Sequence, residues 1–179
     1  MKRIEVAELT LATLDALDVE ALALLIGDER PLQGLPGLVD WRLAGALTRT
    51  LLDGLYAAGP GEALLLSTAG RLPAARVVAV GLAAERGEAE FATVVGRLCE
   101  VVARAGAPSF ATAALPFKGV TSAEACRAWL RAAAAVPGDR LVLLGDPRAL
   151  AADLASARLE ARSEIEVAAF PAGPSTMVR

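Results

Sequence analysis

Short apolar runs alternate along this chain with longer segments of helical periodicity. The apolar runs are residues 20–27, 62–68, 76–82, 109–115 and 141–145, and the helical segments are 37–58, 87–105, 121–136 and 146–157. Strands that alternate with helices of this length are typical of a parallel sheet with helices on both faces. We therefore predict an α/β fold, a three-layer α/β/α arrangement around a mixed, mostly parallel central sheet.

The polarity of the strands predicts their places in that sheet. Residues 62–68 and 76–82 are almost entirely apolar, which indicates central strands. Residues 2–10 and 163–170 mix apolar side chains with charges, so we expect them at the edges of the sheet, where either strand could run antiparallel.

Local signals predict several helix ends. Thr121-Ser122-Ala123-Glu124 has the sequence of a capping box, in which the Thr side chain caps the helix and the Glu reaches back to it. Asp146-Pro147 is typical of an N-cap followed by proline at the first helical position. Residues 59–61 (GPG) should end the helix over 37–58.

Length and composition indicate one domain. The 179 residues are 55% hydrophobic and 22% charged, which is enough to bury a core without disulfides or metal. We expect a single domain over residues 1–170 and a flexible tail over 171–179, which is rich in Pro, Gly and Ser. Cys99 and Cys126 lie far apart, which favours two free, buried thiols in a reducing compartment.

The same features predict the location and exclude some partners. The apolar run 21–26 is far shorter than a membrane span of about 20 residues, and acids interrupt the N-terminal segment. We therefore expect a cytoplasmic protein with no membrane partner. The formal net charge of −3 lacks the basic excess of most nucleic-acid binders, so we expect no nucleic-acid partner.

The chain contains no histidine. Ser-His-Asp and Cys-His nucleophile systems are therefore excluded in their usual form, because no imidazole is present to accept the proton. Zinc sites built on histidine are excluded as well, and two cysteines cannot complete a four-cysteine site. No P-loop is present, and no GxGxxG follows a strand. We expect no metal and no cofactor.

Five residues are candidate ligand contacts, each with a simpler structural interpretation. Asp28 follows a strand and could hold Mg²⁺ with its acidic neighbour, or be a solvated loop residue. Lys118 lies between a strand and a helix, where ligands bind in open α/β sheets. Thr68 and Gly70 could form a backbone-amide cradle or a plain turn. Asp146 could contact a ligand, although the following proline favours a helix cap.

The two tryptophans have different predicted roles. Trp129 lies on a helical apolar stripe with Ala125 and Ala132, which indicates core packing. Trp41 lies beside Arg42 near a helix start, and could mark an interface.

Residues 21–82 carry a more specific pattern. They run ALALLIGDERPLQG over 21–34, LPGLVDWRLAGALTRTLLDG over 35–54 and GEALLLSTAGRLPAARVVAVGL over 61–82. The segment resembles the N-terminal domain of the leucyl aminopeptidase family, with Gly37–Asp40 at the helix start, Gly61-Glu62 opening a strand and Arg76–Leu82 as the next strand. Ala83 stands where that family often has a second glycine. The order of the later elements extends the resemblance over roughly residues 1–160.

That resemblance implies a fold similar to macro domains, with a mixed sheet between helices. In the family, peptide hydrolysis belongs to a C-terminal domain whose metal-binding motif and active-site Lys and Arg have no counterpart here. We therefore expect that this chain is not an enzyme. The leading interpretation is a non-catalytic interaction or regulatory domain, which forms homo-oligomers or docks on a separate peptidase-type subunit.

Four other functions stay open or are disfavoured. A macro-like pocket would bind, or slowly hydrolyse, a nucleotide or ADP-ribose derivative as a small-molecule ligand, although the sequence shows no glycine-rich phosphate loop. A role as the accessory part of an aminopeptidase is a further alternative. Peptidase activity of this chain itself is not expected, and DNA binding is disfavoured by its acidic charge.

Overall fold

The computed structural model describes residues 1–82, 88–115 and 119–171. The strands are β1 (Arg3–Glu8), β2 (Ala21–Ile26), β3 (Ala63–Ser67), β4 (Arg76–Gly81), β5 (Ser109–Ala113), β6 (Arg140–Gly145) and β7 (Glu166–Ala169). The helices are α1 (Leu11–Ala16), α2 (Gly34–Arg42), α3 (Ala46–Leu52), α4 (Glu88–Arg104), α5 (Ser122–Ala135) and α6 (Pro147–Ala161). No helix of the described residues combines the length and apolar character needed to cross a bilayer.

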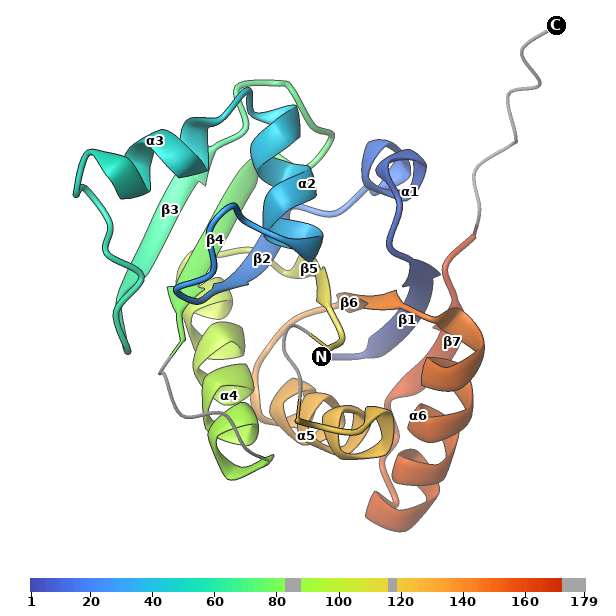
Figure 1. The fold of residues 1–179 in the computed structure, drawn as a ribbon. Helices are drawn as coiled ribbons and strands as arrows, with labels where there is room; N and C mark the ends of the chain where they lie inside the picture. The colour runs from blue at the N-terminus through green and yellow to red at the C-terminus, as the bar shows by residue number, and fades with distance from the viewer. Residues whose placement is uncertain (83–87, 116–118, 172–179) are drawn as a thin grey trace, which may run out of the picture.

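The strands form one sheet in the order β3-β4-β2-β5-β6-β1-β7. Within the described residues every neighbouring pair is parallel except β3 and β4. Helices α1, α2 and α3 lie on one face of the sheet, and α4, α5 and α6 lie on the other (Figure 1). The predicted three-layer α/β/α architecture with a mixed, mostly parallel sheet is therefore confirmed.

Strand β2 supplies side chains to both apolar layers. All six of its residues are buried. Because successive side chains of a strand point to opposite faces, Leu22, Leu24 and Ile26 pack under α1–α3, whereas Ala23 and Leu25 pack against the α4–α6 layer. A strand that is apolar on both faces can lie only in the interior of a covered sheet.

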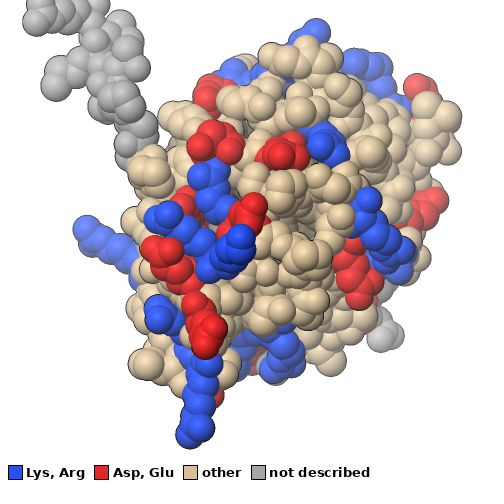
Figure 2. Space-filling view, turned by 180° about the vertical axis from the view of Figure 1, so that it is seen from behind, with Lys and Arg blue, Asp and Glu red and all other residues tan. Residues whose placement is uncertain are grey.

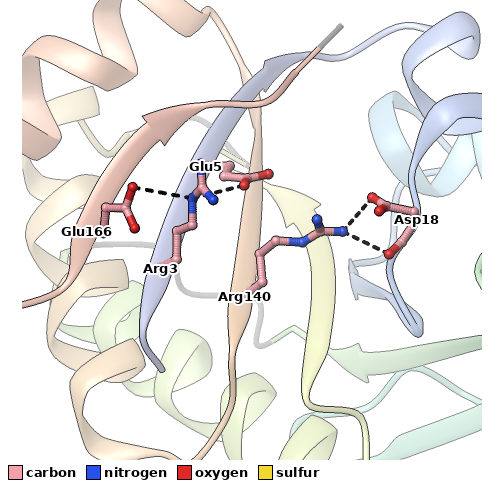
Figure 3. A network of polar contacts seen from close by, with 5 residues as sticks. All are labelled: Arg3, Glu5, Asp18, Arg140 and Glu166. Carbon is pink, nitrogen blue, oxygen red and sulfur yellow. Dashed lines mark hydrogen bonds and ion pairs between the residues drawn. The ribbon is translucent and has the colours of Figure 1, made fainter. Parts of the chain in front are cut away.

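The expectation that residues 2–10 form an edge strand is wrong. Strand β1 lies between β6 and β7 and is parallel to both. Its charged side chains form ion pairs within β1 and with β7 (Figure 3). The guanidinium Nε of Arg3 lies 3.1 Å from Oε1 of Glu5, whose side chain is 2% exposed, and 3.8 Å from Oε1 of Glu166 on β7.

Figure 3 also shows how strand β6 is joined to the segment between α1 and β2. Nη2 of Arg140 on β6 donates to the backbone oxygen of Asp18 at 2.8 Å and to its carboxylate at 2.5 Å (Figure 3). This hydrogen bond holds the pKa of the Asp18 carboxyl below its ordinary value.

Strand β3 was predicted to be central, and this expectation is also wrong. It is an edge strand and runs antiparallel to β4. Its apolar side chains cover only one face, because Leu64 and Leu66 pack against the α1–α3 layer while Leu65 is 57% exposed. The last strand, β7, does lie at an edge, and it is parallel to β1.

The helix predicted over 37–58 is two helices. Ala44 and Gly45 adopt left-handed backbone angles, with φ of 53° and 79°, and break the helical run. The break is stabilised by Asp40, whose backbone oxygen accepts from the Gly45 amide at 2.8 Å. The Asp40 carboxylate also accepts from Thr48 at the start of α3. The first of the two helices, α2, begins at Gly34, three residues earlier than predicted.

Other local predictions are confirmed. Thr121 and Glu124 form the capping box of α5, and Asp146 caps α6, which continues to Ala161 rather than ending near residue 157. Cys99 and Cys126 are free and buried, and burial raises their pKa values to about 12 and about 11. The predicted tail lies outside the described residues except for Pro171.

The two tryptophans provide a stability test. Trp129 is fully buried, and its Nε1 donates to the carbonyl of Ala114 at 2.9 Å. Replacing it as Trp129→Phe leaves that buried carbonyl without its donor, and should lower the free energy of unfolding by about 1–3 kcal/mol. The matched control is Trp41→Phe, at a position that is 64% exposed, with an expected change within about 0.5 kcal/mol. Denaturant titration followed by circular dichroism measures both, and equal effects would contradict a core role for Trp129.

Candidate functional site

The connections of β2 and β5 leave the sheet on opposite faces. Strand β2 leads into α2 on one face, while its neighbour β5 leads toward α5 on the other (Figure 1). In open α/β sheets, ligands bind outside the carboxyl ends of the two strands at which the connections change face. The topology therefore places the candidate site at the carboxyl ends of β2 and β5.

The pairing of these two strands is consistent with an opening there. The β2–β5 ladder contains two residue pairs, Ala21 with Phe110 and Leu22 with Ala111, at the amino ends of the strands. On its other side, β2 pairs with β4 over six residue pairs. Toward their carboxyl ends β2 and β5 are thus no longer joined as a ladder, and the space between them is available to other groups.

A cavity of about 110 Å³ occupies this position. It is lined by residues that end β2 and β5, by the segment that joins β2 to α2, and by the start of α2: Leu9, Leu25, Ile26, Gly27, Glu29, Leu32, Gln33, Gly34, Leu35, Pro36, Ala113 and Leu115. We call it the switch-point cleft. Most of its lining residues are apolar or glycine, and Glu29 and Gln33 are the polar side chains among them.

The loop from β2 to α2 is braced by one of its own side chains. Nη1 of Arg30 donates to the backbone oxygens of Gly27 at 2.9 Å and Glu29 at 2.8 Å. The side-chain amide of Gln33 donates to the oxygen of Pro31 at 3.1 Å. These contacts hold the loop in a compact turn and set the point at which α2 begins.

The start of α2 is not closed by a side chain. Gln33 is its N-cap residue and makes no capping hydrogen bond. Gly34, Leu35 and Pro36 of the first turn line the cleft, and no side chain caps the amides of Gly34 and Leu35; Pro36 has no backbone N–H. A helix N-terminus with unsatisfied amides attracts anions through those groups and the helix dipole.

Two other helices that begin at this edge, α5 and α6, have side-chain caps. The Thr121 hydroxyl accepts from the Glu124 amide at the start of α5, and the Glu124 carboxylate accepts from the Thr121 amide at 2.7 Å. These hydrogen bonds from Thr121 keep the pKa of the Glu124 carboxyl below its ordinary value. At α6, the Asp146 carboxylate accepts from Arg148 at 2.9 Å and Ala149 at 3.3 Å. A carboxylate at each of these helix starts disfavours an anionic ligand there.

The structure separates the five residues that the sequence singled out. Asp28 lies exposed on the β2–α2 loop beside the cleft, and Asp146 lies at the same edge of the sheet as the cap of α6. Lys118 lies outside the described residues. Thr68 and Gly70 lie at the opposite edge, because β3 runs antiparallel and ends where β4 begins.

Thr68 belongs to a turn between β3 and β4. Its amide donates to the oxygen of Ala75 and its own oxygen accepts from Arg71, both at 3.0 Å. Gly70 provides the positive φ of 74° in the same turn. This geometry matches the plain-turn interpretation of the segment and does not bring it near Asp28.

Sequence reasoning missed the start of α2 as a site element. The sequence pattern predicts a helix that starts at Gly37, so Gly34 and Leu35 fall outside it. The available signal was a fully apolar strand, a short polar loop and then a glycine at the first helical position, which is the arrangement that brings helix amides to the end of a strand.

Two further observations concern the chemistry of the surroundings. Among residues 1–82, 88–115 and 119–171, no group of three or more acidic or cysteine side chains is placed to hold a metal ion. On the face shown in Figure 2, acidic and basic side chains are interleaved rather than gathered by sign.

The comparisons with known proteins bear on the fold. By sequence, the chain matches no protein-family model and none of the curated proteins. By structure, it resembles the macro domain of ganglioside induced differentiation associated protein 2, with a TM-score of 0.65, 13% identity, and coverage of 96% of this chain and 86% of that one. It also resembles a mutant Oceanobacillus iheyensis macrodomain with ADPR, with a TM-score of 0.63, 14% identity, and coverage of 89% and 92%.

A leucine aminopeptidase is also among the similar structures. The tomato enzyme matches with a TM-score of 0.60 and 13% identity over 88% of this chain, but over only 35% of its own length. At these identities the comparisons establish a macrodomain-like fold and leave the aminopeptidase resemblance limited to one part of that enzyme.

The expectation that this chain is not an enzyme is contradicted. It rested on the missing metal ligands and catalytic residues of a peptidase, whereas the whole-chain matches are macrodomains. The absent residues belong to peptide hydrolysis, so their absence is no evidence against a different reaction.

The packing of α2 on its loop can be tested at two glycines. A Cβ at Gly37 would lie 2.4 Å from the backbone oxygen of Leu32, whereas a Cβ at Gly96 in α4 would meet nothing within 4 Å. Gly37→Ala should lower the free energy of unfolding by about 1–3 kcal/mol because backbone must move. Gly96→Ala should raise it by about 0.5–1 kcal/mol through helix propensity. Thermal or denaturant unfolding measures both, and a stabilising Gly37→Ala would show that α2 is not packed as described.

Proposed function

We propose that the chain binds a nucleotide diphosphate of the ADP-ribose type in the switch-point cleft. The observation that carries this proposal is the uncapped N-terminus of α2, which opens into a cavity at the carboxyl ends of β2 and β5. The similar macrodomain structures that contain ADPR and ADP support the choice of ligand class.

The cleft is suited to such a ligand in two ways. A phosphate group accepts hydrogen bonds from backbone amides and is favoured by the positive end of a helix, which the amides of Gly34 and Leu35 supply. The apolar side chains of Leu9, Ile26 and Leu115 offer a surface for a ribose or base ring.

The polar lining residues add hydrogen-bonding capacity. Glu29 supplies carboxylate oxygens and Gln33 an amide group, both of which can bond the hydroxyls of a ribose. The described walls enclose about 110 Å³, which accommodates a phosphate and part of its neighbouring group rather than a complete dinucleotide. The rest of the ligand would extend beyond this cavity.

The sequence-based interpretation as an interaction or regulatory domain is less well supported. A homo-oligomer or a separate peptidase-type subunit stays a prediction, because no partner chain is part of the structure. A small-molecule ligand agrees better with the fold and with the open helix N-terminus at the switch point.

A substitution at the cap residue of α2 separates binding from folding. Gln33 has the extended backbone of an N-cap, with φ of −114° and ψ of 167°. Gln33→Asp should place a carboxylate on the free amides, raise the free energy of unfolding by about 1 kcal/mol and abolish nucleotide binding by charge repulsion. Gln33→Asn is the control, since it caps the helix without the charge and should weaken binding less.

Isothermal titration calorimetry with ADP-ribose, ADP and inorganic pyrophosphate measures the binding, and thermal shift measures stability. A ligand present at about 100 times its dissociation constant should stabilise the protein by about 2.7 kcal/mol. Chromatography of the same samples detects any turnover of the nucleotide. An absence of heat and of thermal shift for every ligand would overturn the proposal, as would unchanged binding by Gln33→Asp.

A further inference from the structure

A second cavity among the described residues lies away from the switch-point cleft. It is a groove of about 800 Å³ between α5 and α6, closed at one end by Met1 and Lys2. Because Met1 and Lys2 precede β1, this end lies toward the amino ends of the parallel strands, opposite the cleft. We call it the α5–α6 groove.

The floor of the groove is formed by apolar residues, several of which have the small side chain of alanine. Leu130, Ala157 and Ile165 are buried there, and Ala134 and Ala161 lie exposed on its two helices. Alanine at these positions leaves the space between the helices unfilled, so another element can approach the backbone of both.

The two walls carry opposite charges. Arg127 and Arg131 lie one helical turn apart on α5, and Glu160 and Glu164 lie on α6 and just after it. In the part of the chain that the structure describes, no salt bridge or hydrogen bond engages these four side chains. The groove thus keeps two basic and two acidic groups apart across an apolar floor.

The spacing along the walls matches the surface of a helix. Arg127, Arg131 and Ala134 follow positions i, i+4 and i+7 on α5, and Ala157, Glu160 and Ala161 follow i, i+3 and i+4 on α6. Glu164 lies beyond the end of α6, after the left-handed Arg162. A helix laid between two helices contacts such rows with its apolar stripe, and its flanks face the charged walls.

We infer that the α5–α6 groove is a docking site for an amphipathic helix of a partner protein, with acidic residues on the flank facing α5 and basic residues on the flank facing α6. Charge complementarity selects this occupant. A helix with flanks of one sign would be attracted by one wall and repelled by the other. The groove and the proposed nucleotide cleft are at opposite edges, so the inference does not depend on the proposed function.

Three labelled peptides of about 18 residues test the inference by fluorescence anisotropy with the full chain. All three carry the same apolar stripe, and their flanks are one Glu and one Lys, both Glu, or both Lys. The mixed peptide should bind about fivefold more tightly than either of the others. Equal affinities, or no binding of the mixed peptide, would overturn the inference.

Reversing one wall should change the preference. With Arg127→Glu and Arg131→Glu together both walls are acidic, and the peptide with two Lys flanks should become the tightest binder. The control is Arg71→Glu with Arg104→Glu, which makes the same change in net charge at exposed positions outside the groove and should leave the order unchanged. A preference that shifts equally in both double variants would show attraction to net charge only and would contradict a defined site.

Large side chains placed in the groove test whether peptides bind to its apolar floor. Ala134→Trp with Ala161→Trp replaces exposed alanines and should abolish binding of all three peptides without loss of thermal stability. Retained binding would place the peptide elsewhere. Gln33→Asp should leave peptide binding unchanged, so the failure of this inference and the failure of nucleotide binding are distinguishable.

Discussion

Burial of β2 on both faces is the constraint on which the rest of the structure depends. Its six apolar residues need helices above and below the sheet, so the chain must send some connections to each face. The connection after β2 goes to one face and the connection after β5 to the other. The switch-point cleft lies where these two connections diverge. The location of the candidate site therefore follows from the need to cover both faces of β2.

The character of that site depends on how the helices at the same edge are capped. Helices α5 and α6 begin with carboxylates of Glu124 and Asp146 already hydrogen-bonded to their own amides. Helix α2 begins with Gln33, which leaves its amides to another acceptor. A phosphate supplies such an acceptor together with the negative charge that the helix dipole favours. The proposed binding of an ADP-ribose-type ligand therefore follows from a missing cap rather than from a cluster of catalytic side chains.

The two candidate binding surfaces would recognise their ligands through different interactions. In the cleft, backbone amides together with apolar and polar side chains would recognise a compact anion and its attached sugar. In the α5–α6 groove, unpaired arginines and glutamates stand on either side of an alanine-rich floor and favour a long amphipathic element. Because the groove lies toward the amino ends of the strands and the cleft at the carboxyl ends, one surface can be altered without changing the other.

Local sequence patterns were enough to predict the α/β class, the capping box at Thr121 and the cap at Asp146. These depend on residues within a few positions of one another. Strand order depends on long-range contacts, and it sets which candidate residues lie near the cleft. Strand β1 is interior because it pairs with β6 on one side and with β7, more than 160 residues away in sequence, on the other. Strand β3 is antiparallel and at an edge, so Thr68 and Gly70 lie at the end of the sheet opposite the cleft. Long-range pairing depends on the whole chain, so no local pattern could show that Gly34 and Leu35 would face the ends of both β2 and β5.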